Sequence, residues 1–116
     1  MTSDPKTVAD IDPTEAKRLV GEGALLLDVR EDEEWDAGHA PEAVHLAMGL
    51  VSERIDELPT DRTIVCVCRV GGRSGAVASS LLGAGYDVRN IDGGMLAWEA
   101  MALPVVDAHG GAGRVI

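Results

Sequence analysis

Runs of apolar residues alternate with segments of helical periodicity along most of this chain of 116 residues. The runs 24–29 (ALLLDV) and 63–68 (TIVCVC) are apolar at nearly every position, as in parallel strands that are covered on both faces. Shorter runs with strand character lie at 7–11, 43–46 and 87–91. The pattern therefore predicts about five strands.

Helix signals fill the intervals between these runs. Asp12 can cap a helix that has Pro13 at its first position and Glu15 three residues after the cap, so we expect a helix over 13–20. Further helices or helical turns are expected at 32–37, 52–58, 74–82 and from Met95 to Ala102, ahead of Pro104. Strands that alternate with helices favour an α/β fold, with a central parallel sheet of about five strands and helices on both faces.

The length of the chain allows one compact domain and leaves no material for a second. We expect a flexible N-terminus over 1–6, the folded domain over 7–103 and a C-terminal tail over 104–116. The tail is rich in glycine and has no clear period, so it is expected to be mobile or to lie over the domain.

The charge and the cysteine content of the chain argue against several classes of protein. Twenty acidic and ten basic residues give a formal net charge of -10, which repels nucleic acids and anionic lipids. No apolar stretch approaches the ~18 residues of a membrane span, and two neighbouring cysteines do not suggest a secreted, disulfide-stabilised fold. We therefore expect a cytoplasmic protein that binds neither nucleic acid nor membrane. The acidic clusters 31–34 and 53–57 are interpreted as solvated helix faces.

One loop concentrates the reactive residues of the chain. Residues 68–74 (CRVGGRS) follow the predicted strand 63–68 and lead into the predicted helix 74–82. The two glycines permit positive φ angles, and a curled backbone at a helix N-terminus directs several N–H groups at one centre, which suits an anion. These groups, together with Arg69 and Arg73, are expected to favour the Cys68 thiolate. The alternative is a buried core cysteine followed by an ordinary turn.

Cys66 precedes Cys68 by two positions, so a strand places both on the same face, with Cys66 deeper in the sheet. We interpret Cys66 as a packing residue. The alternative is a redox partner for Cys68, which would need local backbone movement to form a disulfide.

Four further motifs accompany the loop: DVRE at 28–31, EW at 34–35, GHAP at 38–41 and DGG at 92–94 with Trp98. Together with the loop they closely resemble the rhodanese homology domain over about residues 8–103. The resemblance implies a parallel sheet flanked by helices and identifies Cys68 as the active cysteine. It also implies a substrate-binding loop formed by Arg69, Val70, Gly71, Gly72, Arg73 and Ser74. Ala40, Glu42 and Val67 depart from the residues common in the family.

The resemblance implies a sulfurtransferase that requires no cofactor. Cys68 would take sulfur from a small anionic donor such as thiosulfate, hold it as a persulfide and pass it to cyanide, a thiol or a sulfur-acceptor protein. Arg69 or Arg73 would hold the donor. Because Arg73 stands five positions after Cys68, one fewer than in the related dual-specificity phosphatases, the spacing argues against a small phosphatase or arsenate reductase. The intact Cys68 argues against a non-catalytic regulatory or binding module.

Asp28, Arg30 and His39 are interpreted as structural support for the loop. Asp28 and Arg30 follow a strand, where a fixed ion pair would hold the scaffold, although a catalytic role is the alternative. His39 could act as a general base for Cys68, but a thiolate stabilised by the loop does not need one, and we expect His39 to organise a turn. The histidines and cysteines lack paired ligand spacing, so no metal site is expected.

Overall fold

The structure is a computed structural model that describes residues 7–116. The predicted flexible N-terminus, residues 1–6, lies outside the described residues. Within them, no helix has both the length and the apolar character needed to cross a lipid bilayer.

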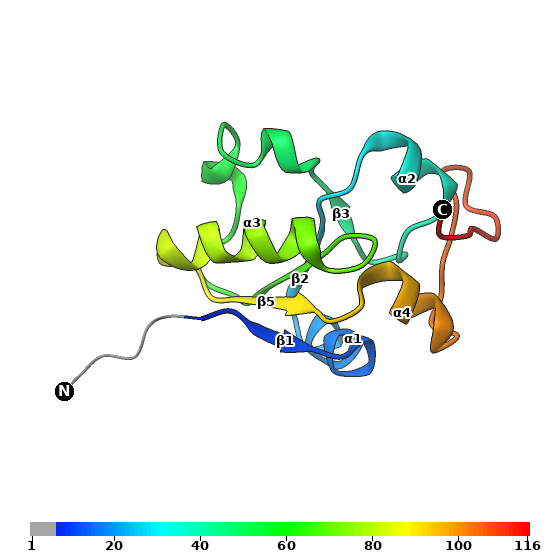
Figure 1. Ribbon diagram of the computed structural model, residues 1–116, viewed down its shortest axis with the longest axis horizontal. Coiled ribbons are helices and arrows are strands. Elements are labelled where there is room, and N and C mark those ends of the chain that lie inside the picture. The colour runs from blue at the N-terminus through cyan, green and yellow to red at the C-terminus, as the bar shows by residue number, and fades with distance from the viewer. Residues whose placement is uncertain (1–6) are drawn as a thin grey trace.

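A five-stranded parallel sheet forms the centre of the molecule, as the pattern of apolar runs predicts (Figure 1). Its spatial order is β1-β5-β4-β2-β3. The strands are β1 (Ala9–Ile11), β2 (Leu25–Asp28), β3 (Val44–His45), β4 (Ile64–Val67) and β5 (Val88–Ile91). β4 lies in the middle of the sheet, so the loop that follows it emerges from the most enclosed strand.

Within residues 7–116, three α-helices and two short 3-10 turns lie between the strands, and a fourth α-helix follows β5. The helices are α1 (Pro13–Gly21), α2 (Asp32–Ala37), α3 (Gly72–Gly83) and α4 (Gly94–Ala100), and the 3-10 turns are η1 (Met48–Leu50) and η2 (Ile55–Glu57). Asp12 caps α1, because its side chain accepts a hydrogen bond of 2.8 Å from the backbone N–H of Glu15. α3 begins before the predicted residue 74, because Gly71 adopts a φ of +117° directly before the helix.

The interior side chains divide into one core on each face of the sheet. In β4, Ile64 and Cys66 belong to the core beneath α3, and Val65 and Val67 belong to the core that α1 and α4 cover. Trp98 of α4 is fully buried in the second core. The alternation confirms the expectation that helices cover both faces of the sheet.

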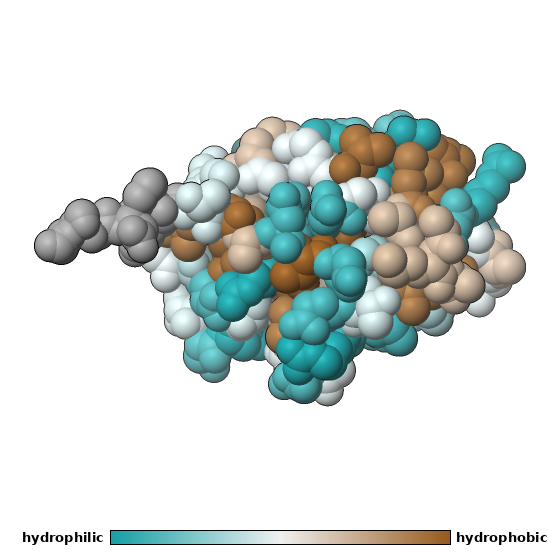
Figure 2. Space-filling view, turned by 60° about the horizontal axis from the view of Figure 1, so that its bottom comes forward, coloured by the Kyte–Doolittle hydropathy of each residue, from teal (hydrophilic) through white to brown (hydrophobic). Residues whose placement is uncertain are grey.

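The outer face of α1 is charged. Arg18 forms ion pairs of 2.6 Å with Glu15 and 2.7 Å with Glu22, and Figure 2 shows hydrophilic side chains gathered over the part of the surface where α1 lies. These exposed pairs contribute little to stability. Their position fits a helix that buries one face and presents the other to water.

Residues 104–116 lie against the domain. The backbone of Val106 pairs with that of His39, and the backbone N–H of Arg114 donates to the carbonyl oxygen of Ala37 at 3.0 Å. Val115 packs against the core that contains Trp98. The segment therefore covers the end of α2, at the same end of the sheet as the loop after β4.

The start of α4 is hydrogen-bonded to the loop that follows β4. The backbone N–H groups of Met95 and Leu96 donate to the carbonyl oxygens of Cys68 and Arg69, at 2.8 and 3.1 Å. The close approach depends on Gly94, which has a φ of +60° and no room for a side chain: a Cβ atom there would lie 2.5 Å from backbone atoms of Arg69.

Replacement of Gly94 by alanine is therefore expected to lower the free energy of unfolding by about 1–3 kcal/mol, because the positive φ and the contact with the loop both oppose a side chain. Denaturant unfolding measures the change. Gly83→Ala is the matched control, since a Cβ at this last residue of α3 meets nothing within 4 Å. Equal stability of the two variants would contradict the close fit between α4 and the loop.

Candidate active site

The sulfur of Cys68 lies at the base of the loop that joins β4 to α3. Cys68 comes directly after the last residue of β4 and is only 1% exposed. Its Sγ accepts a hydrogen bond of 3.1 Å from the backbone N–H of Gly71 and one of 3.2 Å from the hydroxyl of Ser74. The loop thus turns its donors inward, toward the sulfur.

Two opposing effects determine the pKa of the Cys68 thiol. Burial raises it, because a charged sulfur loses hydration, but hydrogen bonds from the Ser74 hydroxyl and from the backbone N–H groups of Ser74, Gly71 and Val70 lower it. The hydrogen bonds prevail, and the net result is a lowered pKa. The site therefore favours a thiolate at a position where water is largely excluded.

Both loop arginines have partners other than Cys68. Arg73 makes two hydrogen bonds to the carboxylate of Glu34, at 2.7 and 2.9 Å. Arg69 donates from Nε to the backbone oxygen of Ile116 at 3.0 Å. Attraction to Cys68 contributes less than Glu34 to the raised pKa of Arg73. Hydrogen bonds from the loop, and not the arginines, are therefore the main stabilisers of the thiolate.

The structure corrects the interpretation of the acidic cluster 31–34, because Glu34 does not lie on a solvated helix face. Its side chain is only 14% exposed, and its carboxylate joins α2 to the start of α3 through Arg73. The hydrogen bonds from Arg73 lower the pKa of Glu34 to about 2. Glu34 also completes a capping box with Glu31 at the start of α2, so one side chain fixes both the helix and the loop arginine.

Asp28 and Arg30 form a fully buried ion pair at the end of β2. Arg30 Nη2 donates to Asp28 Oδ2 at 2.8 Å and to the carbonyl oxygen of Gly38 at 2.7 Å. The pair therefore ties the end of β2 to the end of α2. Among residues 7–116, Nη1 of Arg30 has no hydrogen-bond partner, so a buried donor remains available beside the pair.

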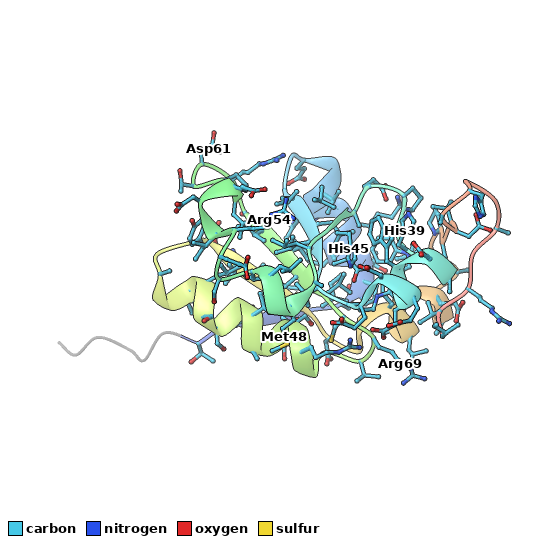
Figure 3. The ribbon with its side chains drawn as sticks, turned by 90° about the horizontal axis from the view of Figure 1, so that it is seen from above. His39, His45, Met48, Arg54, Asp61 and Arg69 are labelled. Atoms are coloured by element: carbon cyan, nitrogen blue, oxygen red, sulfur yellow. The ribbon has the colours of Figure 1, made fainter. Side chains whose placement is uncertain are left out.

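His39 belongs to an aromatic stack. Its ring lies 3.6 Å from that of Trp35, which also stacks on His45 at 4.9 Å. Because a carbonyl oxygen can only accept, Nδ1 of His39 donates to the Trp35 carbonyl at 2.8 Å. Figure 3 shows His39 and His45 close together, with Arg69 at the edge of the molecule on the other side of α2. The described contacts join His39 to this stack and to the C-terminal segment, and none joins it to Cys68.

Cys66 lies in the same core as Cys68 and is fully buried. Burial, together with the nearby Cys68, raises the pKa of its thiol to about 12. Cys66 therefore remains a protonated, unreactive thiol at neutral pH, in agreement with its interpretation as a packing residue.

Sequence reasoning missed Asn90, which is 5% exposed at the end of β5 and bonds to both Ser74 and Gly71. A polar amide within a predicted strand, next to Ile91, was the available signal, because an amide that the strand buries needs partners. No such signal predicted the hydrogen bonds between α4 and the loop, because they join backbone atoms of segments far apart in the chain.

Iodoacetamide is expected to modify Cys68 with a half-maximal rate at a pH below the ~8.5 of an ordinary thiol. Cys66 should react only after denaturation, because its thiol stays protonated and buried. Peptide mass spectrometry over a pH series measures both. Earlier modification of Cys66, or a midpoint for Cys68 at or above the ordinary value, would contradict the described electrostatics.

Glu34→Gln is expected to lower stability at neutral pH by about 1 kcal/mol, because it removes a charged partner of Arg73. Folded Glu34 stays ionised down to a pKa of about 2, whereas its ordinary value is 4.5. The stabilisation is therefore complete above pH 4.5 and is lost as the pH falls toward 2.

Urea unfolding over that pH range should show a smaller decline for Glu34→Gln than for the wild type. Glu57→Gln is the matched control, because Glu57 pairs with Arg54 on the surface and should change stability very little. Parallel acid profiles for the wild type and Glu34→Gln would show that the Glu34 pair does not stabilise the fold.

Comparisons with known proteins agree on one family. The model of the rhodanese-like domain matches residues 12–101. A sulfurtransferase of Allochromatium vinosum is 40% identical over 90 residues, which cover 77% of this chain and 84% of that protein. The thiosulfate sulfurtransferase GlpE of Pseudomonas syringae is 37% identical over 90 residues, covering 77% of this chain and 85% of GlpE.

Among solved structures, a rhodanese-like domain protein from Staphylococcus aureus superposes with a TM-score of 0.73 at 31% identity, over 78% of this chain and 91% of that one. The likeness to rhodanese-like proteins is therefore found in the fold as well as in the sequence. This chain belongs to the rhodanese-like domain family and is a transferase of the rhodanese type.

Proposed function

We propose that the protein moves a sulfane sulfur from an anionic donor such as thiosulfate to a thiophilic acceptor, through a persulfide on Cys68. The observation that carries the proposal is the pair of hydrogen bonds to Cys68 Sγ, at 3.1 Å from Gly71 and 3.2 Å from Ser74. Donors directed at this sulfur stabilise a thiolate, and a thiolate is the form that attacks.

The reaction proceeds in two half-reactions. The Cys68 thiolate attacks the outer sulfur of thiosulfate; a bond forms between Sγ and that sulfur, the bond to the sulfite sulfur breaks, and sulfite leaves with the electron pair. The negative charge of the resulting persulfide lies on the outer sulfur. An acceptor nucleophile then attacks the outer sulfur, and Cys68 leaves as the thiolate with which the cycle began.

The backbone N–H groups of Val70, Gly71 and Ser74 are directed at the reacting sulfur, where they hold negative charge in both states of the enzyme. Arg69 is the better placed of the two arginines to position the donor. Within residues 7–116, only its Nε is bonded, whereas both Nη atoms of Arg73 bond to Glu34. Asp28, Arg30 and His39 act as structural support.

The acceptor is a small thiol or a sulfur-acceptor protein, with cyanide as the laboratory substitute. Val70, at the tip of the loop, is 56% exposed and offers an apolar contact to such a partner. Both cysteines are free thiols, which suits the reducing conditions of the cytoplasm. The thiolate is itself the nucleophile, so the reaction as proposed requires no cofactor.

Two other functions are tested by the same experiment. A regulatory module would keep the fold and bind through the loop without turnover, and a small phosphatase or arsenate reductase would use Cys68 against phosphorus or arsenic. The tight loop, with Gly71 and Ser74 both bonded to the sulfur, supports a sulfur atom on Cys68 over a larger oxyanion.

Purified protein is expected to convert thiosulfate and cyanide to thiocyanate, and Cys68→Ser to lose this activity by at least about a thousandfold, because the nucleophile is removed. Cys66→Ser is the matched control and should retain turnover if it folds. Equal background rates for the wild type and Cys68→Ser would overturn the proposal. Hydrolysis of an aryl phosphate that depends on Cys68 would favour the phosphatase instead.

A further inference from the structure

The hydroxyl of Ser74 stands between two strong hydrogen-bond acceptors. Its Oγ lies 3.2 Å from Cys68 Sγ and 2.6 Å from Asn90 Oδ1. The Gly71 carbonyl oxygen lies further away, at 3.4 Å. A serine hydroxyl has one proton to donate, so Ser74 cannot donate to the sulfur and to Asn90 at the same time.

The contacts of Asn90 fix the orientation of its amide. Nδ2 lies 3.2 Å from the carbonyl oxygen of Gly71 and 3.2 Å from Asp10 Oδ1. Both of these oxygen atoms accept from Nδ2, so the NH₂ group faces them and Oδ1 faces Ser74. Asn90 is therefore an acceptor toward the hydroxyl and cannot exchange roles with it.

We propose that Asn90 is a positioning residue that competes with the Cys68 thiolate for the single proton of Ser74. The inference rests on Cys68 acting as the nucleophile of the proposed function. When Sγ carries the negative charge, the hydroxyl donates to sulfur. When the charge lies on the outer sulfur of a persulfide, Sγ is a poorer acceptor, and the hydroxyl donates to Asn90.

Two consequences follow for the chemistry. The buried hydroxyl has an acceptor in both states, so forming the persulfide does not leave an unsatisfied donor. The thiolate also receives a weaker hydrogen bond than it would without Asn90. It is therefore less stable and more nucleophilic, because nucleophilicity rises with the pKa of a thiol.

Several charged or titratable groups surround this site. Asp10 of β1 bonds to Asn90, and Arg73 is paired with Glu34 of α2. Cys66 of β4 is protonated because burial raises its pKa to about 12. The Asp28–Arg30 pair lies at the end of β2, which pairs with β4. Because leucine and alanine carry no charge, replacement of Asn90 by either leaves these charged groups in place and tests the role of its amide.

Asn90→Leu removes the acceptor with little change in side-chain size. The pKa of Cys68, measured from the ultraviolet absorbance of the thiolate with Cys68→Ser as the blank, is expected to fall by about half a unit, because Ser74 then donates to sulfur alone. In a Ser74→Ala background the same replacement should not move the pKa, since the effect acts through the hydroxyl.

Ser74→Ala by itself should raise the pKa of Cys68, and Ser79→Ala, on the exposed face of α3, should leave it unchanged. A rise in the pKa on Asn90→Leu, or an equal shift with and without the Ser74 hydroxyl, would overturn the proposal and show that Asn90 only braces the loop. If Asn90→Leu does not fold, Asn90→Ala provides the same comparison.

This titration uses no sulfur donor. Its outcome is therefore independent of the thiocyanate assay: loss of turnover would overturn the proposed function, whereas only the pKa comparison decides the role of Asn90.

Discussion

A buried thiolate is stable only where hydrogen-bond donors replace the water it has lost, and most of the structure around Cys68 serves that requirement. With the residue 1% exposed, hydration alone cannot hold the charge. The backbone N–H of Gly71 and the hydroxyl of Ser74 supply the two nearest donors. Both depend on the sharp turn that Gly71 permits at a φ of +117°, so the reactivity of the sulfur is a property of the backbone as much as of the cysteine.

The remaining elements keep this loop in one conformation. α4 bonds to it from below through two backbone N–H groups, and the absence of a side chain at Gly94 allows that approach. From the side, Glu34 of α2 holds Arg73, and α2 is itself tied to β2 by the buried Arg30. These contacts come from segments far apart in the chain. The sheet brings them together because the ends of parallel strands meet along one edge.

The elements of the fold could be predicted from the sequence more completely than the contacts within the site. The two central strands β2 and β4 were predictable because they lie in nearly continuous apolar runs. The start of α1 was predictable because Asp12, Pro13 and Glu15 carry a local capping signal. The position of the loop was predictable because the apolar run 63–68 precedes it and the helical pattern over 74–82 follows it. Glu34 was misinterpreted as solvated, because its partner stands 39 positions away, and composition cannot show which member of an acidic cluster faces inward.

The central claim is that Cys68 carries sulfur. Brief incubation with thiosulfate, removal of the donor and mass spectrometry of the intact and digested protein test it most directly, because they detect the covalent intermediate itself. The account predicts one added sulfur atom on the peptide that contains Cys68, lost again on addition of cyanide and absent from Cys68→Ser. An unmodified wild-type protein, or sulfur attached to Cys66 instead, would contradict it.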